Sequence, residues 1–147
     1  MIVSVVLGFV IIGILVALAM PNLSEGKQLA KQKRTLASIR TIGTLVEAYG
    51  RDHNKVYPRA ESMAELQTLL VPKYGSKIPL LDAWGNDLRY GCDDEQCTRY
   101  AITSSGADRI FENFYTKKYS KGTTTNLDCD IVWADGAFLQ YPAETSR

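Results

Sequence analysis

Three cysteines, Cys92, Cys97 and Cys129, are the side chains of this chain with the most specific chemistry. Cys92 and Cys97 flank a loop of four residues, so in an oxidising compartment they are well placed to form a disulfide across a hairpin. One cysteine is then left over, and a pairing of Cys129 with Cys92 or Cys97 stays open. Zinc is a much weaker interpretation, because the Cys-x4-Cys spacing is poor for zinc and His53 is the only histidine.

The single histidine also argues against an enzyme. A Ser-His-Asp or Cys-His arrangement would depend on His53 alone, which has no evident partner in the sequence. The chain also lacks a glycine-rich phosphate-binding loop. We therefore predict that the protein is not an enzyme. The alternative, a membrane-tethered enzyme, would require a cleft near His53 with a second titratable group. We expect Trp84 and Trp133 to anchor the core or a loop rather than to bind a ligand.

The distribution of charge is more informative than its total. The 147 residues carry 17 basic and 16 acidic side chains, and a formal net charge of +1 excludes a strongly basic nucleic-acid-binding protein and an acidic disordered chain. All of these charges lie in residues 25–147. Because the length suits one domain, the sequence predicts an apolar segment joined to a single polar body.

Residues 1–20 are apolar apart from Ser4 and match the length of about 20 residues that a membrane-spanning helix needs. The run is too long for the apolar part of a signal peptide and lacks its basic beginning. It is also apolar on every side, which does not suit a helix buried in so small a body. We expect residues 1–24 to form a helix in a membrane or a filament core, with a kink or melted turn at Pro21.

Residues 25–55 show the pattern of an amphipathic helix that continues the first one. Apolar residues recur along one stripe at helical spacing. Basic residues lie among them with few acids, and we interpret them as a solvated helix face rather than a nucleic-acid-binding surface. The stripe comprises Leu29, Leu36, Ile39, Ile42, Val46 and Tyr49, and the basic residues are Lys27, Lys31, Lys33, Arg34, Arg40 and Arg51.

Residues 56–147 are expected to form the body, which begins with a short helix. A capping-box pattern at Ser62–Glu65 opens this helix, and Pro72 follows its end. Its buried side is expected to hold Leu66, Leu69 and Leu70.

Two hairpins are expected in the rest of the body. One joins residues 87–92 to residues 97–103, and the other joins residues 131–133 to residues 137–141 around an Asp-Gly turn. Residues 104–126 between them are polar and rich in turn formers. We therefore predict an α+β fold in which a long N-terminal helix packs on a small antiparallel sheet. The loop between the hairpins also carries an aromatic patch of Phe111, Phe114 and Tyr115.

Several motifs, in this order, resemble those of the type IV pilin-like superfamily. The apolar segment carries Ile12-Gly13-Ile14-Leu15 and then Ala17-Leu18-Ala19-Met20-Pro21-Asn22-Leu23. The body carries Asp82-Ala83-Trp84-Gly85-Asn86 and later Ser104-Ser105-Gly106-Ala107-Asp108. Over nearly its whole length the chain is similar to the major pseudopilins of type II secretion systems.

The resemblance implies a structural role. In that family a prepilin peptidase removes a basic leader and the new first residue is methylated. Basic residues after an apolar segment normally keep the body in the cytoplasm, whereas the resemblance implies a body in the periplasm. A basic leader in front of the segment would remove this conflict. The subunit then spans the inner membrane once, with its body in the periplasm and the lipid bilayer around its helix. An assembly platform stacks it, with minor pseudopilins or pilins, into a homopolymer that drives protein secretion. Nucleic acid is not expected as a primary partner.

Two residues at the N-terminus depart from the family pattern. Alignment on Pro21 places Ser4 where the family has a glutamate that pairs with the N-terminal amine of a neighbouring subunit. It also leaves Met1 one residue after the usual phenylalanine. Ser4, Gly13 and Pro21 are therefore the positions that the resemblance assigns to the filament core and its assembly. A milder departure is Ala83, where proline is more common.

The resemblance also implies a calcium site, because the C-terminal loop of the family often binds Ca²⁺ through aspartates and carbonyl oxygens. Asp108 matches the acid of the Ser-Gly-Ala-Asp motif, and Asp128 and Asp130 match a later acidic pair. Ser105 would offer its carbonyl oxygen. Calcium takes about six to eight oxygen ligands, which these groups can supply. The simpler alternative is that the three loop acids cap turns.

Two other functions remain open. The missing glutamate and the long segment 109–126 are compatible with a subunit of a surface or competence pilus, which would be extracellular. The missing glutamate also suits a single-pass membrane protein whose body binds a ligand or partner without polymerising.

Overall fold

The computed structural model describes residues 2–112, 122–124 and 126–143, without the side chains of residues 2–7, 9 and 15–23. These residues form two compact units, Met1–Lys31 and Gln32–Arg147. Helix α1 (Ile2–Asp52) is continuous through Pro21, so a melted turn at that proline is wrong, whereas the alternative expectation of a kink stays a prediction. A proline removes a single helical hydrogen bond, and the bonds on either side of it hold the helix together.

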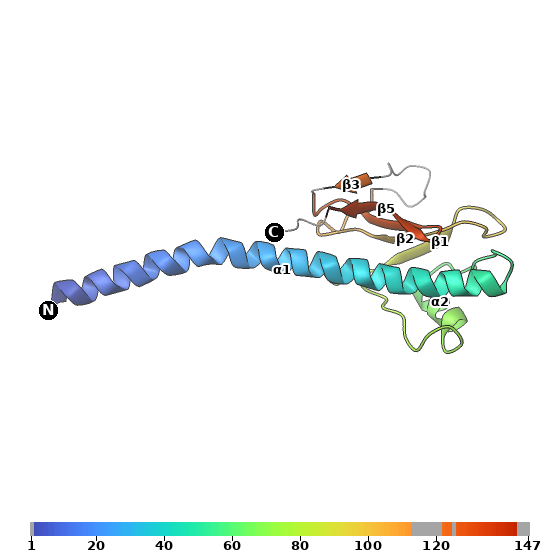
Figure 1. Cartoon of the computed structure of the whole chain (residues 1–147), viewed down its shortest axis with the longest axis horizontal. Coiled ribbons are helices and arrows are strands. Elements are labelled where there is room, and N and C mark those ends of the chain that lie inside the picture. The colour runs from blue at the N-terminus through green and yellow to red at the C-terminus, as the bar shows by residue number, and fades with distance from the viewer. Residues whose placement is uncertain (1, 113–121, 125, 144–147) are drawn as a thin grey trace. The chain divides into compact units, whose positions relative to one another are not determined.

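The first unit is helical throughout its described length (Figure 1). Among the described residues, no helical stretch combines the length and the apolar character needed to cross a membrane. Most side chains of residues 1–24 lie outside the described set. The expected membrane helix therefore stays a prediction.

In the second unit, one face of α1 is buried and carries the core. Ile39, Ile42 and Val46 of the predicted stripe are fully buried, and Leu36 and Tyr49 pack against them in part. Two polar residues that the stripe does not include, Gln32 and Thr35, are buried as well. The helix ends because Asn54 and Lys55 adopt left-handed backbone conformations, and the Lys55 N–H donates to the Gly50 carbonyl at 2.7 Å.

Helix α2 (Met63–Leu70) begins as its capping box predicts. The Ser62 hydroxyl accepts a hydrogen bond from the Glu65 N–H at 3.2 Å. Leu66 and Leu70 are fully buried. The expected burial of Leu69 is wrong, because this side chain is 41% exposed and Met63 takes the third buried position.

The sheet contains the two expected hairpins and one unexpected strand. Strands β1 (Arg89–Cys92) and β2 (Tyr100–Ser104) form the first hairpin, and β4 (Ile131–Ala134) and β5 (Ala137–Pro142) form the second. Strand β3 (Gly122–Thr124) pairs with β5 in parallel, and the strand order is β1-β2-β4-β5-β3.

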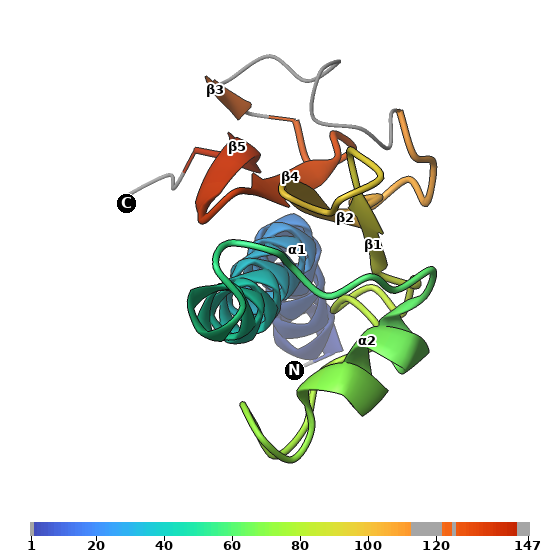
Figure 2. The ribbon, with the colours of Figure 1, turned by 90° about the vertical axis from the view of Figure 1, so that its right-hand side faces the viewer.

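The sheet is therefore mixed, and the expectation of a purely antiparallel sheet is wrong. The three residues of β3 lie within residues 104–126, a polar and turn-rich stretch whose composition does not indicate a strand. Figure 2 shows the C-terminal part of α1 on one face of the sheet and α2 near β1.

Glycines let α1 come close to the aromatic residues of the body. A Cβ atom on Gly43 would lie 2.5 Å from the Trp133 indole, and one on Gly50 would lie 2.6 Å from the Tyr57 ring. Trp133 is only 8% exposed and belongs to the core. The two glycines are thus packing positions, where the rings replace the missing side chains.

A polar network also joins α1 to the sheet. The Glu47 carboxylate accepts hydrogen bonds from the Tyr100 hydroxyl at 2.9 Å and from the Tyr57 hydroxyl at 3.4 Å. The Trp133 indole N–H donates to the Tyr100 hydroxyl oxygen at 2.9 Å. Burial is the main cause that raises the pKa of Tyr100 above its usual value, so Tyr100 stays a neutral donor.

Replacement of Gly43 by alanine tests the close contact between α1 and Trp133. The added methyl group would meet the rigid indole at 2.5 Å, so overpacking should outweigh the gain in helix propensity. We expect Gly43→Ala to lower the free energy of unfolding by about 1–2 kcal/mol in chemical denaturation. Gly26→Ala is the matched control, because nothing lies within 4 Å of its added methyl group. Equal stability of the two variants would contradict the packing role of Gly43.

Candidate functional site

The loop after residue 80 is built around the carboxylate of Asp82, which is 7% exposed. Its Oδ1 atom accepts hydrogen bonds from the Trp84 N–H at 2.9 Å and the Asn86 N–H at 2.8 Å. Its Oδ2 atom accepts from the Asn86 side-chain amide at 3.2 Å and the Ser104 hydroxyl at 2.8 Å. One carboxylate therefore fixes its own loop and ties that loop to the end of β2.

This loop also connects α1 to the predicted calcium loop. The Ala83 N–H donates to the buried Thr35 hydroxyl of α1 at 3.0 Å. The Asn86 side-chain amide donates to the Gly106 carbonyl at 3.0 Å. Asn86 thus supports the Ser-Gly-Ala-Asp segment, and Thr35 fixes the supporting loop on the helix.

The structure brings the two predicted calcium-binding segments together through their backbones. The Ala107 N–H donates to the Leu127 carbonyl at 3.1 Å. Gly106 has a φ of +69°, and a Cβ there would lie 2.8 Å from the Cys129 carbonyl oxygen. Only glycine fits this conformation and this contact without a shift of the backbone.

The four residues predicted to bind calcium have different environments. Asp108 and Asp128 are exposed, whereas Asp130 and Ser105 are fully buried. The Asp108 carboxylate accepts from the Ile110 N–H at 2.8 Å, and the Asp130 carboxylate accepts from the Glu112 N–H at 3.0 Å. Asp108 therefore caps its own turn, as the simpler interpretation supposes, whereas Asp130 joins two segments that are 18 residues apart.

The donor atoms are oxygens, which are the kind of ligand that calcium prefers. Oxygen ligands come from two touching segments, and the Ser105 hydroxyl is buried with no hydrogen-bond partner among the described residues. Within the part of the chain that the structure describes, however, no three acidic, cysteine or histidine side chains are grouped to hold a metal ion. Calcium binding therefore stays a prediction.

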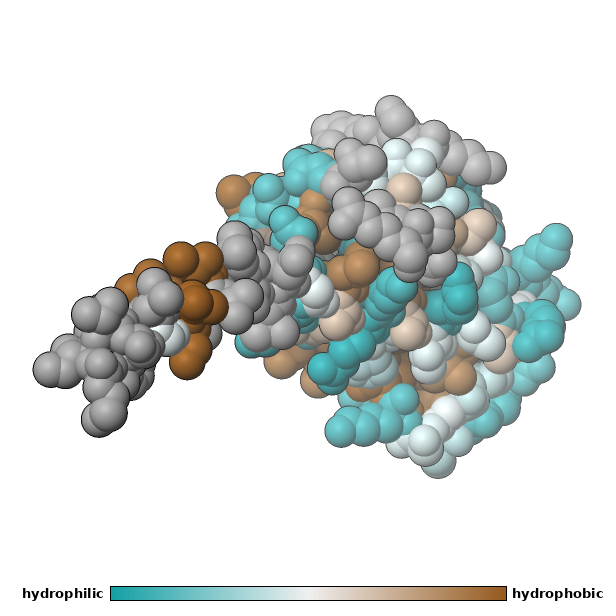
Figure 3. Space-filling model, turned by 60° about the vertical axis from the view of Figure 1, so that its left-hand side comes forward, coloured by the Kyte–Doolittle hydropathy of each residue, from teal (hydrophilic) through white to brown (hydrophobic). Residues whose placement is uncertain are grey.

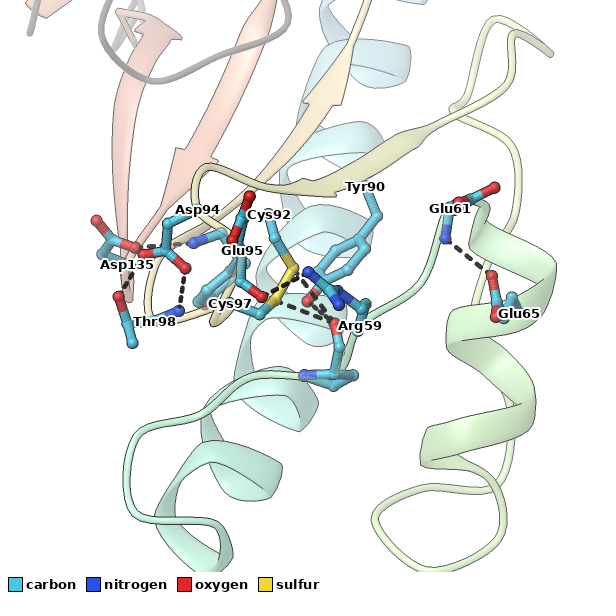
Figure 4. Close-up of a disulfide and its surroundings, with 12 residues drawn as sticks. Arg59, Glu61, Glu65, Tyr90, Cys92, Asp94, Glu95, Cys97, Thr98 and Asp135 are labelled. Carbon is cyan, nitrogen blue, oxygen red and sulfur yellow. Dashed lines mark hydrogen bonds between the residues drawn. A yellow bond between two sulfur atoms is a disulfide. The ribbon is translucent and has the colours of Figure 1, made fainter.

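Cys92 and Cys97 form a disulfide that closes the first hairpin (Figure 4). The Pro58 carbonyl oxygen lies 3.6 Å from the Cys92 sulfur and 3.5 Å from the Cys97 sulfur, and it accepts the Tyr90 hydroxyl at 2.6 Å. The Arg59 guanidinium donates to the Glu95 carbonyl. The disulfide thus closes the hairpin, and the Tyr90 and Arg59 hydrogen bonds attach it to the segment that follows α1. Cys129 is a free thiol.

His53 has no catalytic arrangement around it among the described residues. Its ring is exposed and stacks on Tyr49, with a ring-centroid distance of 3.8 Å, and its Nδ1 atom lies 2.8 Å from the Tyr49 carbonyl oxygen. The neighbouring Asp52 accepts the Tyr74 hydroxyl at 3.0 Å and pairs with Lys73 at 3.3 Å. The Tyr74 hydrogen bond is the main cause that lowers the pKa of Asp52.

Apolar side chains are exposed on α1 in the first unit, as the brown surface in Figure 3 shows. Val10, Ile11, Ile12 and Ile14 are 51–59% exposed, and nothing lies within 4 Å of a Cβ added to Gly13. The side chains of Ser4 and Pro21 lie outside the described residues.

In comparisons with known proteins, no family model matches the chain, and no curated protein matches it.

Replacement of Asp82 tests how far the loops depend on one carboxylate. Asp82→Ala would leave the Trp84 and Asn86 N–H groups and the Ser104 hydroxyl without their acceptor. We expect it to lower the free energy of unfolding by about 2–4 kcal/mol in chemical denaturation. The exposed Asp87 provides the control, and Asp87→Ala should change stability by less than about 0.5 kcal/mol. A similar loss in both variants would contradict the central role of Asp82.

Calcium binding is testable by thermal unfolding. If residues 105–108 and 127–130 hold Ca²⁺, millimolar Ca²⁺ should raise the melting temperature and a chelator should reverse the change, because a ligand of the folded state stabilises it. Asp108→Asn and Asp128→Asn should each reduce the increase, whereas Asp87→Asn should not. Identical melting curves in Ca²⁺ and in chelator would contradict the site.

Proposed function

We propose that the protein is a non-enzymatic structural subunit that polymerises through its N-terminal helix into a filament. The observation that carries this proposal is the exposure of Val10, Ile11, Ile12 and Ile14 on the helix of the first unit. Four large aliphatic side chains exposed within five residues indicate a surface that an apolar environment normally covers. The second unit does not require this surface for its own core, which is complete without residues 1–31.

Packing against copies of the same helix would satisfy these residues without a new chemical interaction. A helix that moves from lipid to the core of a filament exchanges one apolar environment for another, so van der Waals packing decides the stability. The absence of a Cβ at Gly13 would let a neighbouring helix approach closely. The close approach that Gly13 permits favours a homopolymer over a binding protein that remains a single-pass monomer.

Within this class, we propose a periplasmic pseudopilus that drives type II protein secretion. The Asp82–Asn86 and Ser104–Asp108 segments carry the resemblance, and they are the two segments joined by the Asn86 amide. A surface or competence pilus is the second candidate, because Ser4 stands where the glutamate of the family is expected. Inner-membrane insertion, an assembly platform and a prepilin peptidase belong to both versions.

A matched pair of isoleucine substitutions tests polymerisation. Ile12 and Ile110 are 59% and 64% exposed, but Ile12 lies on the helix of the first unit and Ile110 in the body. Each buried isoleucine contributes about 1.5–3 kcal/mol, so Ile12→Gln should reduce the sedimentable polymer at least about tenfold, while Ile110→Gln should not. Negative-stain microscopy of the pellet and the amount of protein in the membrane fraction separate a loss of assembly from a loss of insertion.

Two results would contradict the proposal. A wild-type chain that stays monomeric in membranes and after detergent extraction would indicate the non-polymerising alternative. An equal loss of polymer in both variants would show that the helix is not the assembly surface. The intact mass of the native protein then tests processing, because a trimmed and methylated first residue is expected for a substrate of prepilin peptidase.

A further inference from the structure

Charge is segregated between residues 25–40 of α1 and the rest of the chain that follows them. Residues 25–40 contain five basic side chains and one acidic side chain, for a net charge of +4. Residues 41–147 contain 12 basic and 15 acidic side chains, for a net charge of −3. The nearly neutral total therefore conceals one basic helical stretch attached to a mildly acidic body.

The basic stretch is accessible. Lys27, Lys33 and Arg34 are exposed and Lys31 is half-buried. Lys27, Lys31 and Arg34 follow one another at the i, i+4, i+7 spacing that places side chains on one face of a helix. The ion pairs found among the described residues involve Lys73 and Arg99, so none of them neutralises this face. Like charges at this spacing repel, which favours a polyanionic partner.

The position of these charges relative to the apolar part of the helix favours one class of polyanion. The exposed apolar side chains at residues 10–14 precede Lys27 on the same helix, and 13 residues of helix rise about 20 Å. Residues 15–26 between them contain one charged residue, Glu25, which lies two positions before Lys27. A helix with this sequence, inserted in a bilayer by its apolar part, carries its first basic residues at the level of the lipid headgroups.

We propose that Lys27, Lys31 and Arg34 bind the headgroups of anionic phospholipids in the membrane that holds the apolar segment. This inference rests on the membrane-inserted state of the proposed function and adds the class of lipid to it. The net charge of −3 on residues 41–147 weakens the attraction of those residues to the same surface. A duplex nucleic acid is a poorer partner, because the net negative body would oppose binding along a long polyanion.

Lipid selectivity in vesicles tests the inference. The full-length chain is reconstituted in vesicles of phosphatidylcholine and phosphatidylglycerol, and electron paramagnetic resonance measures how much of each spin-labelled lipid is immobilised on the protein. We expect phosphatidylglycerol to be preferred by about fivefold or more, from about 1 kcal/mol for each basic residue near the surface. About 1 M salt should abolish the preference, because it shortens the screening length to about 3 Å.

A triple variant with Lys27→Gln, Lys31→Gln and Arg34→Gln should lose the preference. The matched control replaces Arg51, Lys55 and Lys77 with glutamine, which removes the same charge from exposed positions elsewhere. Equal immobilisation of both lipids by the wild-type chain, or an equal loss in both triple variants, would overturn the inference but not the proposed filament. Tighter binding of a short DNA duplex through the same three residues would also overturn it. Failure of the wild-type chain to enter vesicles would instead remove the membrane step, on which both proposals depend.

Discussion

The close approach of α1 to the sheet at Gly43 is the constraint on which the body depends. The Trp133 indole occupies the space of the missing side chain, and its N–H reaches the Tyr100 hydroxyl at 2.9 Å. Tyr100 in turn donates to Glu47, one turn further along α1. The apolar contact and the polar network thus both hold α1 against the sheet. A buried network whose hydrogen bonds are all made specifies a single arrangement more strongly than apolar packing alone.

Much of the fold is predictable because the relevant signals are local. The capping box at Ser62 specifies the start of α2, and the Asp135-Gly136 turn specifies the second hairpin, since both of its residues adopt positive φ. The core face of α1 follows from its apolar periodicity. In contrast, β3 is only three residues long and exists through its pairing with β5, so no local pattern identifies it.

The site is less predictable because it depends on contacts between distant segments. The acid type of Asp108, Asp128 and Asp130 is visible in the sequence, whereas the buried position of Asp130 is set by the surrounding strands. The role of Asp82 could be suspected from its Asx-turn sequence, but its bond to Ser104 joins residues 22 positions apart. The Thr35 hydroxyl accepts a hydrogen bond from the Ala83 N–H of a distant loop. The apolar periodicity along α1 gives no sign of this contact, so it does not predict the burial of Thr35.

The order of strands has a consequence for how the protein matures. Strand β3 precedes β4 and β5 in the chain but pairs only with β5, at the edge of the sheet. While the ribosome has not passed Pro142, the residues of β3 have no partner strand, although the β1–β2 hairpin and its pairing to β4 can already form. A chain held before that point would present three unpaired residues, the kind of exposed edge at which strands of different molecules associate.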